Sequence, residues 1–290
     1  PRWHSSAVTL LDGRVLIVGA NCLAATASCN GAATTADLFD PSTGTTAKKT
    51  LQKERAFARS VLLPDGRVLI SSYNDPSLEV YDPDTDAFTL LPHSQAHAFG
   101  FMVRLRDGRA LLGGGDGGVT AADLFDPDTN QLAPTANPMK QGRSMVTAHT
   151  LPDGRVMIVG GASQSAGAID TPLSSIEYYD PKTDQFTLAP YTLSVGRTWH
   201  ASALVRDGTV LAMGGYTLKA CDSSVGSVDQ IDPIKGTVTA FAALPSSKKS
   251  TEWNAVTLLD GSIVAVGGGA CGTTQALPEI YFLPGAPVAK

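Results

Sequence analysis

One pattern recurs six times along this chain of 290 residues. Each copy has a short apolar segment, the dipeptide Asp-Gly, a second apolar segment that ends near two glycines, and a third segment that ends at Asp-Pro. The Asp-Gly dipeptides lie 42 to 54 residues apart, at Asp12-Gly13, Asp65-Gly66, Asp107-Gly108, Asp153-Gly154, Asp207-Gly208 and Asp260-Gly261. A period of this length indicates a repeat architecture in which each copy is one structural unit.

The other markers of the pattern keep the same order. The third segment ends at Asp40-Pro41, Asp82-Pro83, Asp126-Pro127, Asp180-Pro181 and Asp232-Pro233, with Leu283-Pro284 in the sixth copy. These markers place the repeats at residues 1–52, 53–94, 95–140, 141–194, 195–247 and 248–290.

The fourth repeat shows how each copy is expected to fold. Residues 145–151 form the first strand, Asp153-Gly154 a hairpin turn, and the apolar run 156–159 a strand buried on both faces. Residues 176–179 and 185–188 give two more strands around the Asp-Pro turn. Six such units without helical periodicity predict an all-β, six-bladed β-propeller with four antiparallel strands per blade, as a single domain over residues 1–290. The sixth blade takes its outer strand from residues 286–290 or lacks one.

Composition limits the possible partners. The net charge of −5 gives no overall basic field, so nucleic acid is not expected as a partner. No apolar run approaches the roughly 18 residues that a membrane span needs. The chain begins at Pro1 within a repeat, which we interpret as a trimmed or a mature, processed chain.

The four cysteines indicate an oxidising compartment. They fall in predicted loops between second and third strands, at Cys22, Cys29, Cys221 and Cys271. Four cysteines allow three pairings, and their places in the repeats favour Cys22 with Cys29 and Cys221 with Cys271. Free thiols and a metal site are the alternatives, although the spacing suits zinc poorly. Disulfides would place the protein outside the cytosol, in an extracellular, cell-surface or periplasmic location.

The markers resemble those of the kelch-repeat β-propellers over essentially the whole chain. The resemblance rests on the glycine pairs, on the arginine that opens the first strand, and on aromatic residues before Asp-Pro (Phe39, Tyr81, Phe125 and Tyr179). The phrase LPDGRVMIVGG at 151–161 is similar to the bacterial, secreted variety and to the central propeller of galactose and glyoxal oxidases.

The resemblance implies that the first strand of each blade lines a central channel. Ten residues before each Asp-Gly lie Arg2, Arg55, His97, Arg143, Arg197 and Ser250. The cationic members of this set would converge on one channel mouth and bind a carboxylate or phosphate through charge-assisted hydrogen bonds. The alternative is that they are satisfied internally between blades.

Further candidate ligand-binding residues follow along the first strands, namely His4, Trp199, His200 and Glu252. An aromatic platform beside polar groups suits a peptide or a sugar, whereas ordinary packing between blades is the alternative and is favoured for Trp3 and Trp253. The loops between second and third strands are long in the first, fourth, fifth and sixth repeats and short in the others. The predicted binding face is therefore an asymmetric bowl.

No catalytic, metal or cofactor residue is predicted. Copper radical oxidases of this fold need a tyrosine where RWHSS at 2–6 and RTWHAS at 197–202 have tryptophan, so His4 and His200 lack the rest of that ligand set. A sugar epimerase or mutarotase with Glu252 and His200 as an acid–base pair remains an enzymatic alternative.

The hypothesis is therefore a non-catalytic recognition module outside the cytosol. It would bind a protein segment or a glycan, most simply an anionic one, at the arginine-lined mouth, without a membrane span and as part of a larger protein or assembly. A secreted sugar-modifying enzyme and a structural subunit of a surface assembly are the rival hypotheses.

Overall fold

A computed structural model describes residues 4–19, 34–73, 75–92, 97–163, 171–217, 224–243, 251–269 and 279–283. These residues contain strands and turns and no α-helix, as the repeat predicts. In this part of the chain no helix has the length and hydropathy of a membrane span. The chain divides between the third and fourth repeats into two compact units, which are described separately. Unit 1 is residues 1–116 and 121–135, and unit 2 is residues 117–120 and 136–290.

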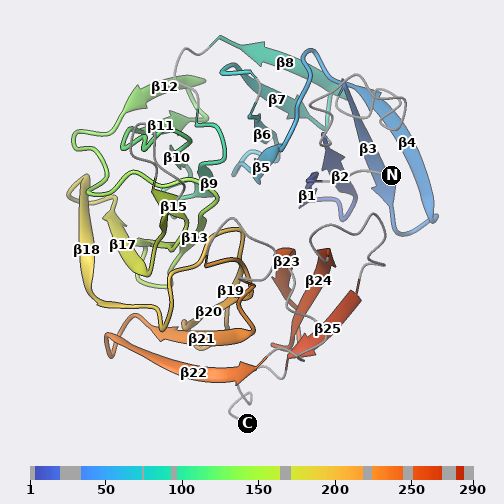
Figure 1. Ribbon diagram of the computed structural model, residues 1–290. Coiled ribbons are helices and arrows are strands. Elements are labelled where there is room, and N and C mark those ends of the chain that lie inside the picture. The colour runs from blue at the N-terminus through green and yellow to red at the C-terminus, as the bar shows by residue number, and fades with distance from the viewer. Residues whose placement is uncertain are drawn as a thin grey trace. The chain divides into compact units, whose positions relative to one another are not determined.

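Unit 1 holds three antiparallel sheets of four strands, each connected in sequence order. Their strands are β1 (Ser6–Thr9), β2 (Val15–Val18), β3 (Thr35–Asp40) and β4 (Thr45–Thr50); β5 (Arg59–Leu62), β6 (Val68–Ser71), β7 (Leu78–Asp82) and β8 (Ala87–Leu91); and β9 (Phe101–Arg104), β10 (Ala110–Gly113), β11 (Ala122–Asp126) and β12 (Gln131–Pro134). The first strands β1, β5 and β9 lie side by side, and β4, β8 and β12 form the opposite edges of their sheets (Figure 1).

Unit 2 repeats this arrangement. Its strands are β13 (Thr147–Thr150), β14 (Val156–Val159), β17 (Ser175–Asp180) and β18 (Gln185–Thr192); the hairpin β15 (Ala162–Ser163) and β16 (Thr171–Pro172); β19 (Ala201–Leu204), β20 (Val210–Met213), β21 (Ser227–Asp232) and β22 (Thr237–Ala243); and β23 (Thr251–Thr257), β24 (Ile263–Gly269) and β25 (Glu279–Leu283). The last sheet has three strands within the described residues. Residues 286–290, the candidate fourth strand, lie outside them.

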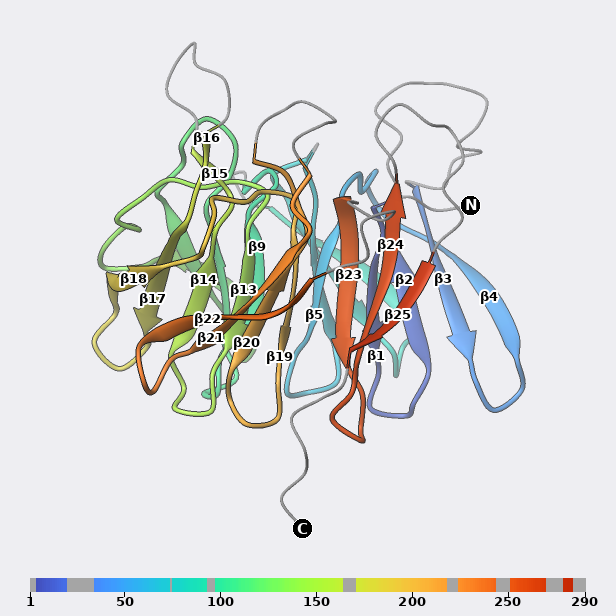
Figure 2. The ribbon, with the colours of Figure 1, turned by 60° about the horizontal axis from the view of Figure 1, so that its bottom comes forward.

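The six Asp-Gly dipeptides form six copies of one hairpin turn. In each, the glycine has a positive φ between 87° and 98°, which costs an L side chain conformational energy. The aspartate accepts the backbone N–H two residues on, for example Asp153 Oδ1 from Arg155 N at 3.0 Å. In unit 2 the turns β13–β14 and β19–β20 lie at one end of the sheets, and the hairpin β15–β16 lies at the other (Figure 2). The described hairpin in the connection from β14 to β17 therefore lies at the end of its sheet opposite the Asp-Gly turn, where the sequence predicts a long loop.

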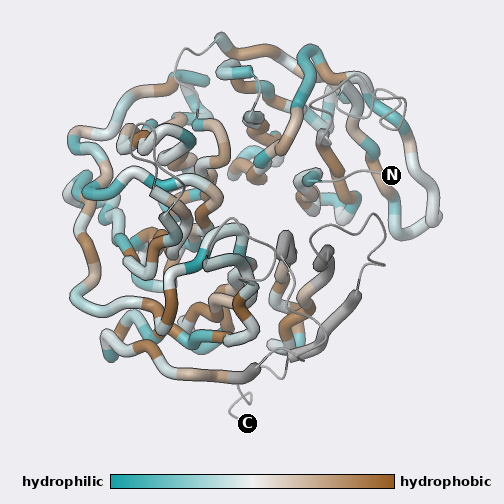
Figure 3. The backbone as a smooth tube through the Cα atoms, in the orientation of Figure 1, coloured by the Kyte–Doolittle hydropathy of each residue, from teal (hydrophilic) through white to brown (hydrophobic). Residues whose placement is uncertain are grey.

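The second strands carry the core. Every residue of β10, β14 and β20 is buried, and hydrophobic segments gather in the inner strands of the sheets (Figure 3). The outer strand β4 is polar and largely exposed, whereas the outer strand β8 is mostly apolar and partly exposed. Core clusters join neighbouring sheets within a unit: Val18 of β2 packs with Val68 and Tyr81 of the next sheet. Burial of apolar faces between sheets thus holds each unit together.

Candidate functional site

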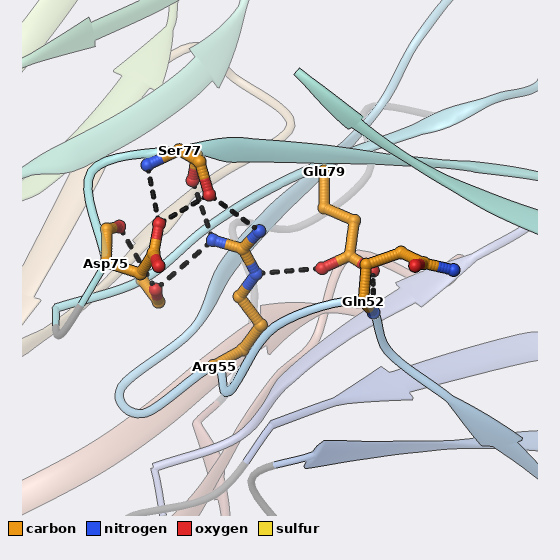
Figure 4. Close-up of polar contacts among 6 residues, drawn as sticks. Gln52, Arg55, Asp75, Ser77 and Glu79 are labelled. Carbon is orange, nitrogen blue, oxygen red and sulfur yellow. Dashed lines mark hydrogen bonds and ion pairs between the residues drawn. The ribbon is translucent and has the colours of Figure 1, made fainter. Parts of the chain in front are cut away.

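We first consider the arginines expected at the channel mouth. Arg55 lies in the turn that leads into β5, which we call the lead-in turn of that sheet. Its side chain is fully buried and its Nε donates to Glu79 Oε2 at 2.9 Å (Figure 4). Nη1 donates to the carbonyl oxygen of Ser77 at 2.6 Å. The second carboxylate oxygen of Glu79 accepts the backbone N–H of Gln52 at 2.6 Å, so one carboxylate fixes both the arginine and the chain that precedes it.

The same arrangement recurs in unit 2. Arg143 Nη2 donates to Glu177 at 3.2 Å, and Arg197 Nη2 donates to Asp229 at 2.9 Å. Glu177 also accepts the backbone N–H of Lys140 at 2.5 Å, and Asp229 accepts that of Ser194 at 3.0 Å. Each carboxylate thus ties the third strand of its sheet to the segment that leads into the first strand. Burial lowers the pKa of both arginines and raises that of Glu177.

The third sheet carries a histidine version of this pair. His97 Nε2 lies 2.7 Å from Asp123 Oδ2, and Nδ1 lies 2.9 Å from the carbonyl oxygen of Gly114. Both side chains are nearly buried. The ring therefore occupies the place of a guanidinium, with a carboxylate at the same position of the third strand.

These contacts change the interpretation of the arginines. Side chains of Arg55, Arg143 and Arg197 have no exposed surface, and each is matched by a carboxylate of its own sheet. A ligand could reach them only by breaking a buried ion pair, which is costly. The structure favours the alternative in which these arginines, with His97, are satisfied internally, over direct ligand contact.

The sequence contains the signal for these pairs. Three residues before each Asp-Pro stands an acid, at Asp37, Glu79, Asp123, Glu177 and Asp229. The sixth repeat has Ile280 at this position and Ser250 in place of the arginine, so cation and acid are lost together. Five repeats therefore carry both halves of the pair and one carries neither.

A second feature is a set of aromatic rings at the lead-in turns of unit 1. His4 and Phe57 have ring centroids 4.5 Å apart, and Phe57 and Phe99 4.8 Å apart. Tyr73, which follows β6, lies 4.4 Å from Phe99 and 5.9 Å from Phe57. We call His4, Phe57, Tyr73 and Phe99 the aromatic cluster. His4, Tyr73 and Phe99 are partly exposed, so the cluster presents ring surface at this end of the sheets.

The backbone holds these rings in place. His4, Phe57 and Phe99 have φ between 49° and 58°, as do Met145 and Trp199 of unit 2. Positive φ is unusual for such residues. Because both units adopt it at the equivalent position, it belongs to the lead-in turn of the repeat and is not peculiar to one sheet.

Arg59, the first residue of β5, was not among the predicted site residues. It is partly buried, and burial lowers its pKa. Burial, and secondarily the charge of Arg59, lowers the pKa of His4 to about 4, so His4 is neutral at pH 7. Tyr73 was missed as well, since it lies in a short loop where the sequence shows no repeated marker.

In unit 2, Trp199 lies partly exposed in its lead-in turn, whereas His200 is buried. His200 Nε2 is 3.0 Å from Thr147 Oγ1, and His149 Nε2 is 2.5 Å from Ser202 Oγ. These two contacts join β13 to β19. Burial lowers the pKa of His200 to about 3, with smaller contributions from Arg197 and His149. A buried, neutral His200 is poorly suited to the acid–base role considered above.

The remaining predicted residues lie outside the part that the structure describes. This holds for Arg2, for the side chain of Glu252 in β23, and for Cys22, Cys29, Cys221 and Cys271. Among the described residues, no group of three or more His, Cys, Asp and Glu side chains could hold a metal ion.

Comparisons with known proteins agree with the repeat. Residues 143–191 match the Kelch motif, and this match begins at buried Arg143. Beta-scruin of Limulus polyphemus is 27% identical over 213 residues, which are 70% of this chain and 22% of that protein. The chain thus spans about a fifth of the length of this relative. Both findings support a kelch-repeat family.

Proposed function

We propose that this chain is a kelch-repeat protein-binding module and that it binds a segment of its partner at the end of the sheets where the lead-in turns lie. The observation that carries this proposal is the aromatic cluster. Three consecutive sheets of unit 1 contribute rings to it, and three of its four side chains are partly exposed. Aromatic side chains dominate the binding energy of protein interfaces because they bury a large rigid surface. The match to the Kelch motif agrees with such a role.

We also propose how the six repeats are arranged. Six repeats with one pattern, three in each unit, suit closure into a single six-bladed propeller. Small-angle X-ray scattering would then give a radius of gyration of about 19 Å, the value of a compact chain of 290 residues. A markedly larger value would show that the units do not close on each other.

A location outside the cytosol is also proposed, because the four cysteines are expected to form disulfides. A glycan is the alternative ligand at the same end of the sheets, because sugar rings also stack on exposed aromatic side chains.

The test of protein binding uses a displayed random peptide library and a glycan array with the intact chain. The variant Tyr73→Ala should weaken the selected peptides roughly tenfold or more, because Tyr73 is partly exposed and contacts two rings. Arg109→Ala, at the opposite turn of the third sheet, is the matched control and should bind normally. Selection of no peptide, or equal binding by Tyr73→Ala, would refute the proposal, and binding to glycans alone would favour the alternative.

A further inference from the structure

We propose that Arg59 binds a side-chain or terminal carboxylate of the partner segment, while the aromatic cluster binds the apolar residue next to it. This inference rests on the proposed function and adds the chemical class of the ligand. It concerns residues of unit 1 only.

The first argument is that the guanidinium of Arg59 has no partner among the described residues. Four other arginines of unit 1 form ion pairs with acids of their own sheets: Arg14 with Asp12, Arg55 with Glu79, Arg67 with Asp65 and Arg109 with Asp107. The described Arg104 and Arg106 are exposed. The backbone of Arg59 pairs with Ser71 in the sheet, but no hydrogen bond or ion pair joins its guanidinium to any described residue, although the residue is partly buried and burial lowers its pKa. A guanidinium in such surroundings is stabilised by an anion, which the described fold does not supply.

The second argument is that the fold does not require an arginine there. The equivalent first-strand positions of the other repeats are Ser6, Phe101, Thr147, Ala201 and Asn254, none of them charged. Arg55, four residues earlier, is by contrast part of the pair that recurs through the repeats. The other repeats fold without a charge at this position, so the charge of Arg59 is better explained by binding than by folding.

The third argument is location. Arg59 begins β5, two residues after Phe57 of the lead-in turn. The positive charge of Arg59 contributes to the lowered pKa of His4. The ring centroids of His4 and Phe57 lie 4.5 Å apart. The cation and the ring surface therefore belong to one region. An acidic residue beside a large apolar one matches both features.

A carboxylate fits better than a phosphate. Arg55, four residues earlier in the lead-in turn, is already neutralised by Glu79, so Arg59 offers a single charge. A phosphate group carries about −1.5 to −2 at neutral pH and would remain half compensated. The planar guanidinium donates two parallel hydrogen bonds to a carboxylate.

The test compares two displayed peptide libraries on the intact chain, one with a fixed Glu flanked by random positions and one with a fixed Gln. We expect enrichment of the Glu library only, with Phe, Tyr, Trp or Leu selected beside the acid. The variant Arg59→Met should weaken those peptides roughly 10- to 100-fold. Arg104→Met, an exposed arginine at the other end of β9 that contacts Leu62, should bind normally.

A stability measurement separates binding from folding. Because Arg59 is partly buried without a partner, Arg59→Met should raise the Tm of the free protein while it abolishes selection of acidic peptides. A lower Tm would show a structural role and overturn the inference. Equal enrichment of both libraries would overturn it while protein binding at the aromatic cluster still stands. Enrichment of neither peptide library would refute both this inference and the proposed protein binding. Binding to sialylated glycans alone, if it depended on Arg59, would show that the ligand is a sugar acid and not a protein segment.

Discussion

At the scale of single residues, the buried arginine–carboxylate pairs show that each charge is tolerated only because its partner is present. Arg55 and Glu79 are each fully buried, so either one alone leaves a charge without compensation. We expect Arg55→Met to lower the free energy of unfolding by about 3–5 kcal/mol, and Arg55→Met with Glu79→Met to recover most of that loss. Urea unfolding of the three proteins measures this.

The matched control is the exposed pair of Arg14 and Asp12, whose loss should cost less than about 1 kcal/mol. A double variant as unstable as Arg55→Met would contradict the interpretation that the pair is replaceable. The sixth repeat, with Ser250 and Ile280, already omits both partners.

At the scale of elements, β13 and β19 are joined by histidines that must stay neutral. Burial lowers the pKa of His149 to about 4 and that of His200 to about 3, from an ordinary 6.5. The unfolded chain therefore binds more protons between pH 6.5 and pH 4. Stability is fully present above pH 6.5 and is lost as the pH falls through that window, by roughly 2 kcal/mol for His200 down to pH 5.

Chemical denaturation at a series of pH values tests this. The double variant His149→Gln, His200→Gln should flatten the dependence between pH 6.5 and pH 5, with a remainder from His4, whose pKa is also lowered. An unchanged slope in the double variant would show that other groups cause the acid sensitivity.

The segments that lead into the strands pass very close to neighbouring backbone. A Cβ on Gly142 would clash with the carbonyl oxygen of Gly118, whereas one on Gly13 would meet nothing within 4 Å. We expect Gly142→Ala to lower the free energy of unfolding more than Gly13→Ala, which costs about 1–2 kcal/mol through its positive φ of 88°. Thermal unfolding of both variants compares them, and the reverse order would contradict the close approach of Gly142 to Gly118.

At the scale of the whole molecule, the prediction concerns the cysteines. If Cys22 pairs with Cys29 and Cys221 with Cys271, the intact chain gains about 2 Da for each disulfide on reduction. Mass spectrometry with and without a reductant measures this, and peptide mapping assigns the pairs. An unchanged mass would remove the argument for an oxidising compartment.

Strands and turns could be predicted from the sequence because they depend on local chemistry. Alternation of apolar segments with Asp-Gly and Asp-Pro is enough to predict the four-stranded sheets and their hairpins, and the second strands at 15–18, 156–159 and 210–213 are confirmed with the predicted bounds.

Only the pairing of strands and the packing of sheets show which charged side chains have partners inside the fold. Arg55 and Arg59 look alike as residues, yet Glu79 comes within 2.9 Å of Arg55 when β7 pairs in its sheet, and no described residue does this for Arg59. Partners 24 residues apart meet through sheet pairing, which no local pattern encodes. The rings of His4, Phe57, Tyr73 and Phe99 likewise meet only because three sheets of unit 1 pack together.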